Sequence, residues 1–412
     1  MGAGACPCAH REGSLVTLLG ILGVLVFVVG LLLSVMLHEA GHFLTARRYG
    51  MKATQFFVGF GPTLWSRQRG ETEYGVKAIP AGGFVKIVGM TPLEEVEPGD
   101  EDRAFYRQPA RRKLVVLAAG STVHFIIAVL LVLGVTAGYG VLKESSPSVA
   151  GVAECVSDQA STECSAAGAV AAPAKKAGLL EGDVVRAVDG VEVTSSEQLV
   201  GAIKAAAGRT VRLTVEREGK QVVVPVAPEQ VERDGKQVGA IGVTLQGKFV
   251  TERYGPVGTV KETGRTLGLL VTGTIKSLTE KLGTITKVYG PERDPEGFIG
   301  VYGAGRISGE IAAADVPAGD KAANLVLLLA GLNFFVGVFN LLPLLPLDGG
   351  HIAVVAFEQA RDRLRRVRGY TGELQRVDMN KLMPVTFAVV VLFASFTVFL
   401  LGADIVNPIT LN

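Results

Sequence analysis

Charged residues are scarce in this 412-residue chain. Asp, Glu, Lys and Arg make up 19% of the residues, and the formal net charge is only +2. So small a net charge implies no broad basic face, which argues against nucleic acid as a partner. By contrast, 48% of the residues are hydrophobic and the mean hydropathy is +0.37. Together with several long apolar runs, these values predict an integral membrane protein with an attached soluble part.

Cysteine is also rare, with four residues in the chain. Cys6 and Cys8 are separated by one residue, which is too few for a usual pair of zinc ligands. Cys155 and Cys164 can form a disulfide if their region lies in an oxidising compartment, or they can remain two free thiols.

A small-x-small cleavage site is missing between the apolar run that starts at Leu15 and His38. The apolar stretch Leu15–Ala46 is also too long for a secretory signal, so we expect it to be a membrane span. Further apolar runs predict spans at Leu114–Leu142, Ala322–Ile352 and Leu382–Leu401.

Lysine and arginine gather in two of the loops between these spans. The loop at 47–113 ends in Arg-Arg-Lys, and the loop at 353–381 has five arginines between residues 361 and 368. The positive-inside rule places both loops in the cytoplasm. The two termini and the long region between the second and third spans are then expected outside.

The first predicted span ends in the sequence His38-Glu39-Ala40-Gly41-His42, an H-E-x-x-H motif. Positions i and i+4 share a helix face, so His38 and His42 can direct nitrogens at one metal ion. Glu39 lies about 100° further round the helix, where its carboxylate can take a proton from a metal-bound water. A chance match of interfacial polar residues is the alternative. Polar groups in a membrane helix are costly unless paired or bound to metal, which favours a zinc site.

A second polar cluster lies in the third predicted span. Pro343 and Pro346 must interrupt the helix, and Asp348 follows directly after them. This break brings Asp348 to the same depth as the two histidines, where a third metal ligand is needed. The alternatives are an Asp-Gly-Gly turn that merely ends the helix, and His351 as a rival ligand.

Two soluble regions carry strand patterns. Residues 53–89 alternate glycine with β-branched and aromatic residues, which predicts short strands against the cytoplasmic end of the first span. The stretch Ala177–Gly190 predicts two strands that flank an Asp-Gly turn, and Ser196–Ala206 predicts a helix. With strands expected at Val211–Arg217 and Gln221–Val226, this region resembles a PDZ domain. PDZ domains bind extended peptides or C-termini by strand addition, and a spacer that binds nothing is the alternative.

These segments give an expected order along the chain. The fold class is a polytopic α-helical membrane protein with four transmembrane helices, a small cytoplasmic membrane-associated β-sheet and one extracytoplasmic α+β PDZ domain. The expected regions are a tail (1–14), helix 1 (15–46), the sheet loop (47–113), helix 2 (114–142), the PDZ region (143–247, core about 150–230), a linker (248–321), helix 3 (322–352), a basic loop (353–381), helix 4 (382–402) and a tail (403–412). Within the linker, Leu267–Lys287 predicts an amphipathic helix and Gly303–Gly305 a loop.

The motifs together resemble the bacterial site-2 proteases, and more narrowly those that cleave anti-sigma factors. They are the H-E-x-x-H sequence, Gly59-Phe60-Gly61, the PDZ pattern, and N-x-x-P-x-x-x-x-D-G beginning at Asn340. The resemblance implies that His38, His42 and Asp348 bind Zn²⁺ and that Glu39 is the general base. It also implies that Asn340 orients the substrate or supports the oxyanion.

One stretch departs from the family pattern. Gly120-Ser121-Thr122-Val123-His124-Phe125 stands where the family usually has G-P-x-x-N-F. Gly120 and Ser121 suit close helix packing. The imidazole of His124 can hydrogen-bond to a neighbouring helix or lie near the metal.

The resemblance further implies an intramembrane zinc metalloprotease of the bacterial inner membrane with both termini outside. Its partners would be the lipid bilayer and single-span membrane proteins such as anti-sigma factors, cut in regulated intramembrane proteolysis after a first extracytoplasmic cut. Strands around Gly59, Phe60 and Gly61 would hold the unwound substrate. A peptide or a C-terminus is a further candidate partner at the PDZ domain. Two alternatives are a membrane zinc protease that cuts juxtamembrane loops and a non-catalytic scaffold that presents the PDZ domain.

Overall fold

The computed structural model describes residues 7–90, 96–156, 164, 170–233, 236–290, 293–294, 297–372 and 377–410. Cys6 therefore lies outside the described residues. The chain divides into two compact units, which are described separately below. The helical unit comprises Met1–Tyr139 and Gly255–Asn412, and the sheet unit comprises Gly140–Tyr254.

Four helices among the described residues are long and apolar enough to cross a membrane. They are α1 (Pro7–Arg48), α2 (Ala110–Gly138), α7 (Ala318–Asn340) and α9 (Met383–Val406, with a short 3₁₀ turn before it). The number and type of these segments agree with the membrane fold expected from the apolar runs. The second segment ends at Gly138 rather than Leu142, because strand β3 begins at Val141.

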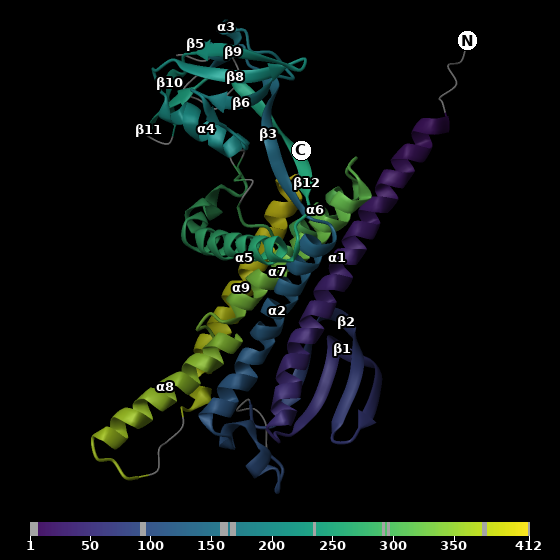
Figure 1. Ribbon diagram of the computed structural model, residues 1–412. Helices are drawn as coiled ribbons and strands as arrows, with labels where there is room; N and C mark the ends of the chain where they lie inside the picture. Colours follow the sequence, from purple (N-terminus) through teal and green to yellow (C-terminus); the bar gives the residue numbers. More distant parts are fainter. Residues whose placement is uncertain are drawn as a thin grey trace. The chain divides into compact units, whose positions relative to one another are not determined.

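Helices α1, α2 and α7 lie side by side (Figure 1). Small residues allow this close approach. A Cβ atom added at Gly41 of α1 would lie 2.9 Å from the carbonyl oxygen of Ala119 on α2. A Cβ atom at Gly337 of α7 would lie 3.0 Å from the ring of Phe125 on α2. Small residues at helix contacts are typical of membrane proteins. Helices in a bilayer associate through van der Waals packing rather than the hydrophobic effect, and small residues let their backbones come close together.

Helices α5 (Pro256–Thr279) and α6 (Val301–Ala313) complete the middle of the helical unit. The prediction of a loop at Gly303–Gly305 was wrong, because these residues lie inside α6. A Cβ atom added at Gly23 of α1 would lie 2.5 Å from the Ser308 carbonyl oxygen of α6. The glycines of α6 belong to a close helix contact rather than a turn, and only the partner helix reveals this.

Two long strands, β1 (Ala53–Arg69) and β2 (Thr72–Ile87), form an antiparallel hairpin that contacts α1. The sequence predicted several short strands here. Gly59 and Gly61 have positive φ angles of 84° and 83°, and the register shifts near them. Glycine tolerates this conformation, so the strand bends where the sequence suggested that it ends.

The base of the hairpin shares a core with three helices. Phe43 of α1, Met51, Ile87 of β2, Leu117 of α2 and Val355 of α8 are all buried in it. Helix α8 (Asp348–Val367) follows α7 after an interruption at 341–347. The third segment is thus two helices, and the turn between them holds both prolines.

The sheet unit is built on a six-stranded antiparallel sheet with the strand order β12-β3-β6-β8-β9, with β7 paired to β6. Its elements are β3 (Val141–Val152), β4 (Cys155–Val156), β5 (Val170–Ala171), α3 (Pro173–Lys176), β6 (Val184–Val188), β7 (Val191–Glu192), α4 (Ser196–Ala205), β8 (Val211–Arg217), β9 (Lys220–Val226), β10 (Glu229–Arg233), β11 (Lys236–Ala240) and β12 (Val243–Glu252). Leu199 and Ile203 of α4 pack into the core against Leu213 of β8.

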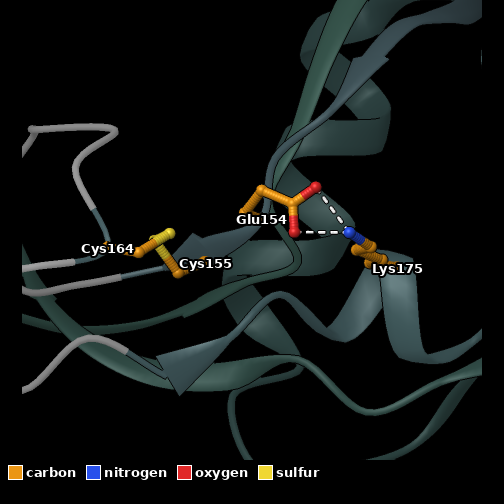
Figure 2. The surroundings of a disulfide bond; sticks show 4 residues. All are labelled: Glu154, Cys155, Cys164 and Lys175. Atoms are coloured by element: carbon orange, nitrogen blue, oxygen red, sulfur yellow. Dashed lines mark hydrogen bonds and ion pairs between the residues drawn. A yellow bond between two sulfur atoms is a disulfide. The ribbon is translucent and has the colours of Figure 1, made fainter.

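Of the two states left open for Cys155 and Cys164, the structure has the disulfide (Figure 2). An ion pair between Lys175 and Glu154 lies close by. The disulfide ties Cys155, the first residue of β4, to Cys164. Such a covalent link stabilises a fold mainly by restricting the unfolded chain.

Candidate metal centre

Helix α1 places the two histidines of its H-E-x-x-H motif on one face. His38 and His42 are one helical turn apart, and their Nε2 atoms lie 3.1 Å from each other. Both residues are buried, with 8% and 4% of their surfaces exposed. Two imidazole nitrogens are therefore held at one point inside the helical unit.

Asp348 reaches the same point from the start of α8. Its Oδ2 atom lies 3.5 Å from His38 Nε2 and 3.3 Å from His42 Nε2. The tight turn before it requires glycine. A Cβ atom at Gly349 would lie 2.3 Å from the carbonyl group of Leu341, and one at Gly350 would lie 2.6 Å from the Leu344 carbonyl carbon. The two glycines let the first turn of α8 fold back onto the end of α7.

We call His38, His42 and Asp348 the ligand cluster. Its three atoms are separated by 3.1, 3.3 and 3.5 Å. Zinc bonds of about 2.0–2.2 Å in a tetrahedron give edges of about 3.3–3.6 Å, so this spacing fits a zinc ion. Asp348 Oδ2 is buried and receives no hydrogen bond from the described residues. A buried carboxylate oxygen without a donor is costly, and a cation at the centre would satisfy it.

The orientation of His42 is fixed from the side opposite the cluster. Its Nδ1 atom lies 2.7 Å from the backbone carbonyl oxygen of Val116 on α2. A carbonyl oxygen can only accept, so Nδ1 carries the proton and Nε2 keeps its lone pair for the cluster. This arrangement is common around metal-bound histidines.

Gly120 of α2 leaves the space that both imidazoles occupy. A Cβ atom there would lie 2.4 Å from His38 Cε1 and 2.5 Å from His42 Nε2. No real side chain tolerates such distances, so even alanine would displace the rings. The sequence indicated Gly120 only as a small residue for helix packing, and its contact with the histidines was not predicted.

His124 fits both interpretations that the sequence left open. Its Nδ1 atom donates to Asn333 Oδ1 of α7 at 2.8 Å, and its ring centroid lies 4.9 Å from that of His38. Asn333 Nδ2 in turn donates to the Ser34 hydroxyl of α1 at 3.0 Å. All three residues are at most 4% exposed. This chain of hydrogen bonds joins α1, α2 and α7 beside the ligand cluster, and Asn333 was not singled out from the sequence.

Glu39 points toward the hairpin. Its Oε2 atom accepts a hydrogen bond from the Val85 backbone N–H of β2 at 3.1 Å. A Cβ atom at Gly83 of β2 would lie 3.6 Å from Glu39 Cγ. The edge of β2 thus sets the position of the carboxylate that follows His38 in the chain.

The remaining predicted site residues take no part in the hydrogen bonds and ion pairs described above. Asn340 is the last residue of α7, and among the described residues it makes no hydrogen bond with the ligand cluster. His351 is not among the described groups that could share a metal ion. Gly59, Phe60 and Gly61 lie in β1, where Phe60 is 44% exposed and stacks on Phe84 at 6.1 Å.

The sequence pattern of Peptidase family M50 matches residues 26–375, which include both histidines, Glu39 and Asp348. The chain belongs to this family, the site-2 proteases. Zinc metalloprotease Rip1 of Mycobacterium tuberculosis is 39% identical over 94% of this chain and 98% of its own length. Zinc metalloprotease Rip1 of Mycolicibacterium smegmatis is 38% identical over 95% and 98%. A putative zinc metalloprotease of Brucella suis is 31% identical over 84% and 86%.

These relationships confirm the resemblance to the site-2 proteases that was drawn from the motifs. The M50 chain is a membrane metalloprotease of the site-2 type, with Zn²⁺ as its cofactor. Membership of a peptidase family also argues against the non-catalytic scaffold.

Proposed function

We propose that this protein hydrolyses a peptide bond within the transmembrane segment of single-span membrane proteins. The observation that carries the proposal is the ligand cluster at the end of the apolar helix α1, with Glu39 beside it. The three buried ligand atoms lie 3.1–3.5 Å apart. A hydrolytic site at this position can reach bonds that soluble proteases cannot.

His38, His42 and Asp348 are the proposed zinc ligands, and three protein ligands are usual for a catalytic site. When bound, zinc supplies a Lewis acid that polarises a carbonyl group and acidifies water. Glu39 takes the proton of the attacking water and passes it to the leaving nitrogen. The Val85 N–H group holds Glu39 Oε2 at 3.1 Å and so orients the base. His42 keeps its metal-facing lone pair because Nδ1 donates to Val116.

Asn340 is proposed to hydrogen-bond the substrate backbone or the developing oxyanion. The support is its place in the family motif that also contains Pro343 and Asp348. Asn333, two turns earlier on α7, is already engaged with His124 and Ser34. We expect Asn340→Ala to lower turnover while zinc stays bound, through a rise of about 3 kcal/mol in the activation free energy. Loss of zinc in this variant would show a structural role instead.

The hairpin is the proposed holder of the substrate. A membrane helix hides its carbonyl groups in its own hydrogen bonds, so a segment must unwind before it is cut. An unwound segment can add as a strand beside Gly59, Phe60 and Gly61. The hydrogen bond from Val85 to Glu39 supports this role, because it joins the same hairpin to the proposed base.

We infer that the sheet unit is a PDZ domain on the extracytoplasmic side, with both chain termini on that side of the bacterial inner membrane. The helix α4 and strands β8 and β9 lie where the PDZ pattern expects them, and the disulfide suits an oxidising compartment. The domain either excludes substrates with large outer domains or docks the new C-terminus of a trimmed substrate. Deleting residues 178–226 should permit cleavage of untrimmed substrates in the first case and slow cleavage of trimmed ones in the second.

The test of the proposed reaction uses purified full-length protein and candidate single-span substrates, such as anti-sigma factors with the outer domain already removed. Mass spectrometry of the products should place the cut inside the transmembrane segment. A cut in a juxtamembrane loop would instead support the alternative protease. Glu39→Gln should keep zinc and lower the rate by about 10²–10⁴-fold, since the base is lost and the ligands remain.

A further inference from the structure

The C-terminal half of α8 carries an apolar stripe that the proposed reaction does not use. Phe357, Leu364 and Val367 are 59%, 51% and 85% exposed, and Ala360 between them is also exposed. These residues recur every three or four positions, so they share one face of the helix. Figure 1 shows this end of α8 running away from the other helices of its unit. The described part of the chain thus leaves the stripe uncovered.

Arginines border this stripe on both sides. At about 100° per residue, Arg361 and Arg365 lie along one edge and Arg363 along the other. Arg361 pairs with Asp362 at 2.9 Å. Within the described ranges, no carboxylate pairs with Arg363, and Arg368 likewise has none. The face therefore combines exposed apolar side chains with unneutralised guanidinium groups.

The same helix begins at the ligand cluster. Asp348 is its first residue, and α8 is continuous to Val367. Glu358 in the middle is tied to Lys113 of α2 at 3.6 Å and accepts the Val377 N–H group at 2.8 Å. The arginine end and Asp348 are thus the two ends of one helix that is fixed at its middle.

We propose that this face of α8 binds anionic phospholipids, with the bordering arginines at the headgroup phosphates and the stripe against the acyl chains. An amphipathic helix with basic edges lies in the membrane interface, with apolar side chains at the acyl boundary and cations at the phosphates. Guanidinium groups suit phosphate because they are weakly hydrated and bind it in a bidentate manner. A second copy of the chain is a poor occupant, since it would bring the same arginines together.

Lipid binding at this end of α8 also bears on cleavage, and this part of the inference rests on the proposed function. Because α8 starts at Asp348, lipid binding at its far end restrains the residue that completes the ligand cluster. Cleavage is then faster in membranes that contain anionic lipid than in membranes that contain only zwitterionic lipid.

The test measures amide hydrogen exchange of residues 357–370 in full-length protein, in nanodiscs of phosphatidylcholine with or without phosphatidylglycerol. Phosphatidylglycerol should slow exchange there by about tenfold, and high salt should reverse this. Arg363→Gln/Arg368→Gln should lose the effect, and Arg363→Lys/Arg368→Lys should keep most of it. The matched control is Arg67→Gln/Arg69→Gln, which removes two exposed arginines from β1.

Equal protection in both kinds of nanodisc would overturn the proposal, because the apolar stripe alone would account for it. Protection that appears in detergent and depends on protein concentration would show a protein partner and would overturn it as well. The exchange measurement does not depend on catalysis. If it succeeds and no substrate is cut in either lipid, the proposed reaction fails while the lipid site stands.

Discussion

Two buried polar clusters in the helical unit differ in how their charges are satisfied. In the ligand cluster, Asp348 Oδ2 has no hydrogen-bond donor among the described residues. Near the end of α9, Asp404 is also buried, but Arg293 donates to its Oδ1 at 2.7 Å. Its Oδ2 accepts the backbone N–H groups of Gly300 at 2.8 Å and Gly303 at 3.0 Å.

The difference separates a structural cluster from a functional one. The Asp404 carboxylate is complete within the protein and fixes the start of α6 to α9. The Asp348 carboxylate has one oxygen without a donor among the described residues, which supports the proposed cation site beside it. The two aspartates should therefore respond to substitution in opposite ways.

Removing Asp348 should have the largest effect on function. Asp348→Ala deletes one of three converging ligand atoms, so we expect zinc content and proteolysis to fall to background. Stability of the zinc-free protein should not fall, because the lost carboxylate had no donor. Elemental analysis and SDS titration measure the two quantities. Asp362→Ala on the same helix is the control, and zinc loss in that variant would mean that α8 itself is disturbed.

Removing Asp404 should lower the stability of the protein and leave its zinc content unchanged. Asp404→Ala leaves Arg293 buried without its partner, and breaking such a pair costs about 3–5 kcal/mol of unfolding free energy. Zinc per folded molecule should stay unchanged. The exposed Asp315 gives a matched variant, Asp315→Ala, with little expected change. A loss of zinc in folded Asp404→Ala protein would contradict the separation of the two clusters.

Gly120 offers a smaller and more local perturbation. In Gly120→Ala the new methyl group would lie 2.4 Å from His38, so the imidazoles must move. We expect zinc affinity to fall by about 10–100-fold, the usual range when the support of a metal ligand is disturbed. Gly134→Ala on the same helix is the control, because nothing lies within 4 Å of its added atom. Equal zinc affinities in competition with a chelator would argue against this contact.

The smallest expected effect is on the stability of the sheet unit, where the buried carboxylate of Asp183 pairs with Arg217. Burial raises the pKa of Asp183, but hydrogen bonds from Arg217 and the Leu180 N–H group outweigh this and lower it. A carboxylate with a lowered pKa stabilises the folded state at pH values above its ordinary, unfolded-state pKa. This stabilisation is lost as the pH falls through the pKa of the folded state. Asp183→Asn should reduce exchange protection factors in β6 and β8 at pH 7. The difference from the unsubstituted protein should shrink below about pH 4. A difference that is constant with pH would rule out a charge effect.

Features that depend on residues close together in the sequence could be predicted from the sequence alone. The four apolar segments, the turn at Pro343 and Pro346, and the helix at Ser196–Ala206 each follow from a local pattern. The i, i+4 spacing also places His38 and His42 on one face without any knowledge of the fold. Asp348 could be predicted as a third ligand because it directly follows the helix break at Pro343 and Pro346.

Features that depend on a contact between residues far apart in the sequence could not be predicted. The glycines of α6 were interpreted as a loop because their partner, α1, lies far away in the sequence. Asn333 and Asn340 are both amides on α7, and only the position of His124 on α2 shows which one joins the network beside the ligand cluster. The contact of Gly120 with both histidines likewise involves two helices.

Local periodicity and residue chemistry thus determined the class of this protein, its apolar segments and the side chains proposed as its metal ligands. Tertiary structure decided how α1, α2 and α8 bring those side chains to within 3.5 Å and which backbone groups orient them. The physical reason is that the patterns of helices and strands depend only on residues a few positions apart in the sequence. The cost of a buried carboxylate, or of one added methyl group, depends on whichever atoms the fold places beside it.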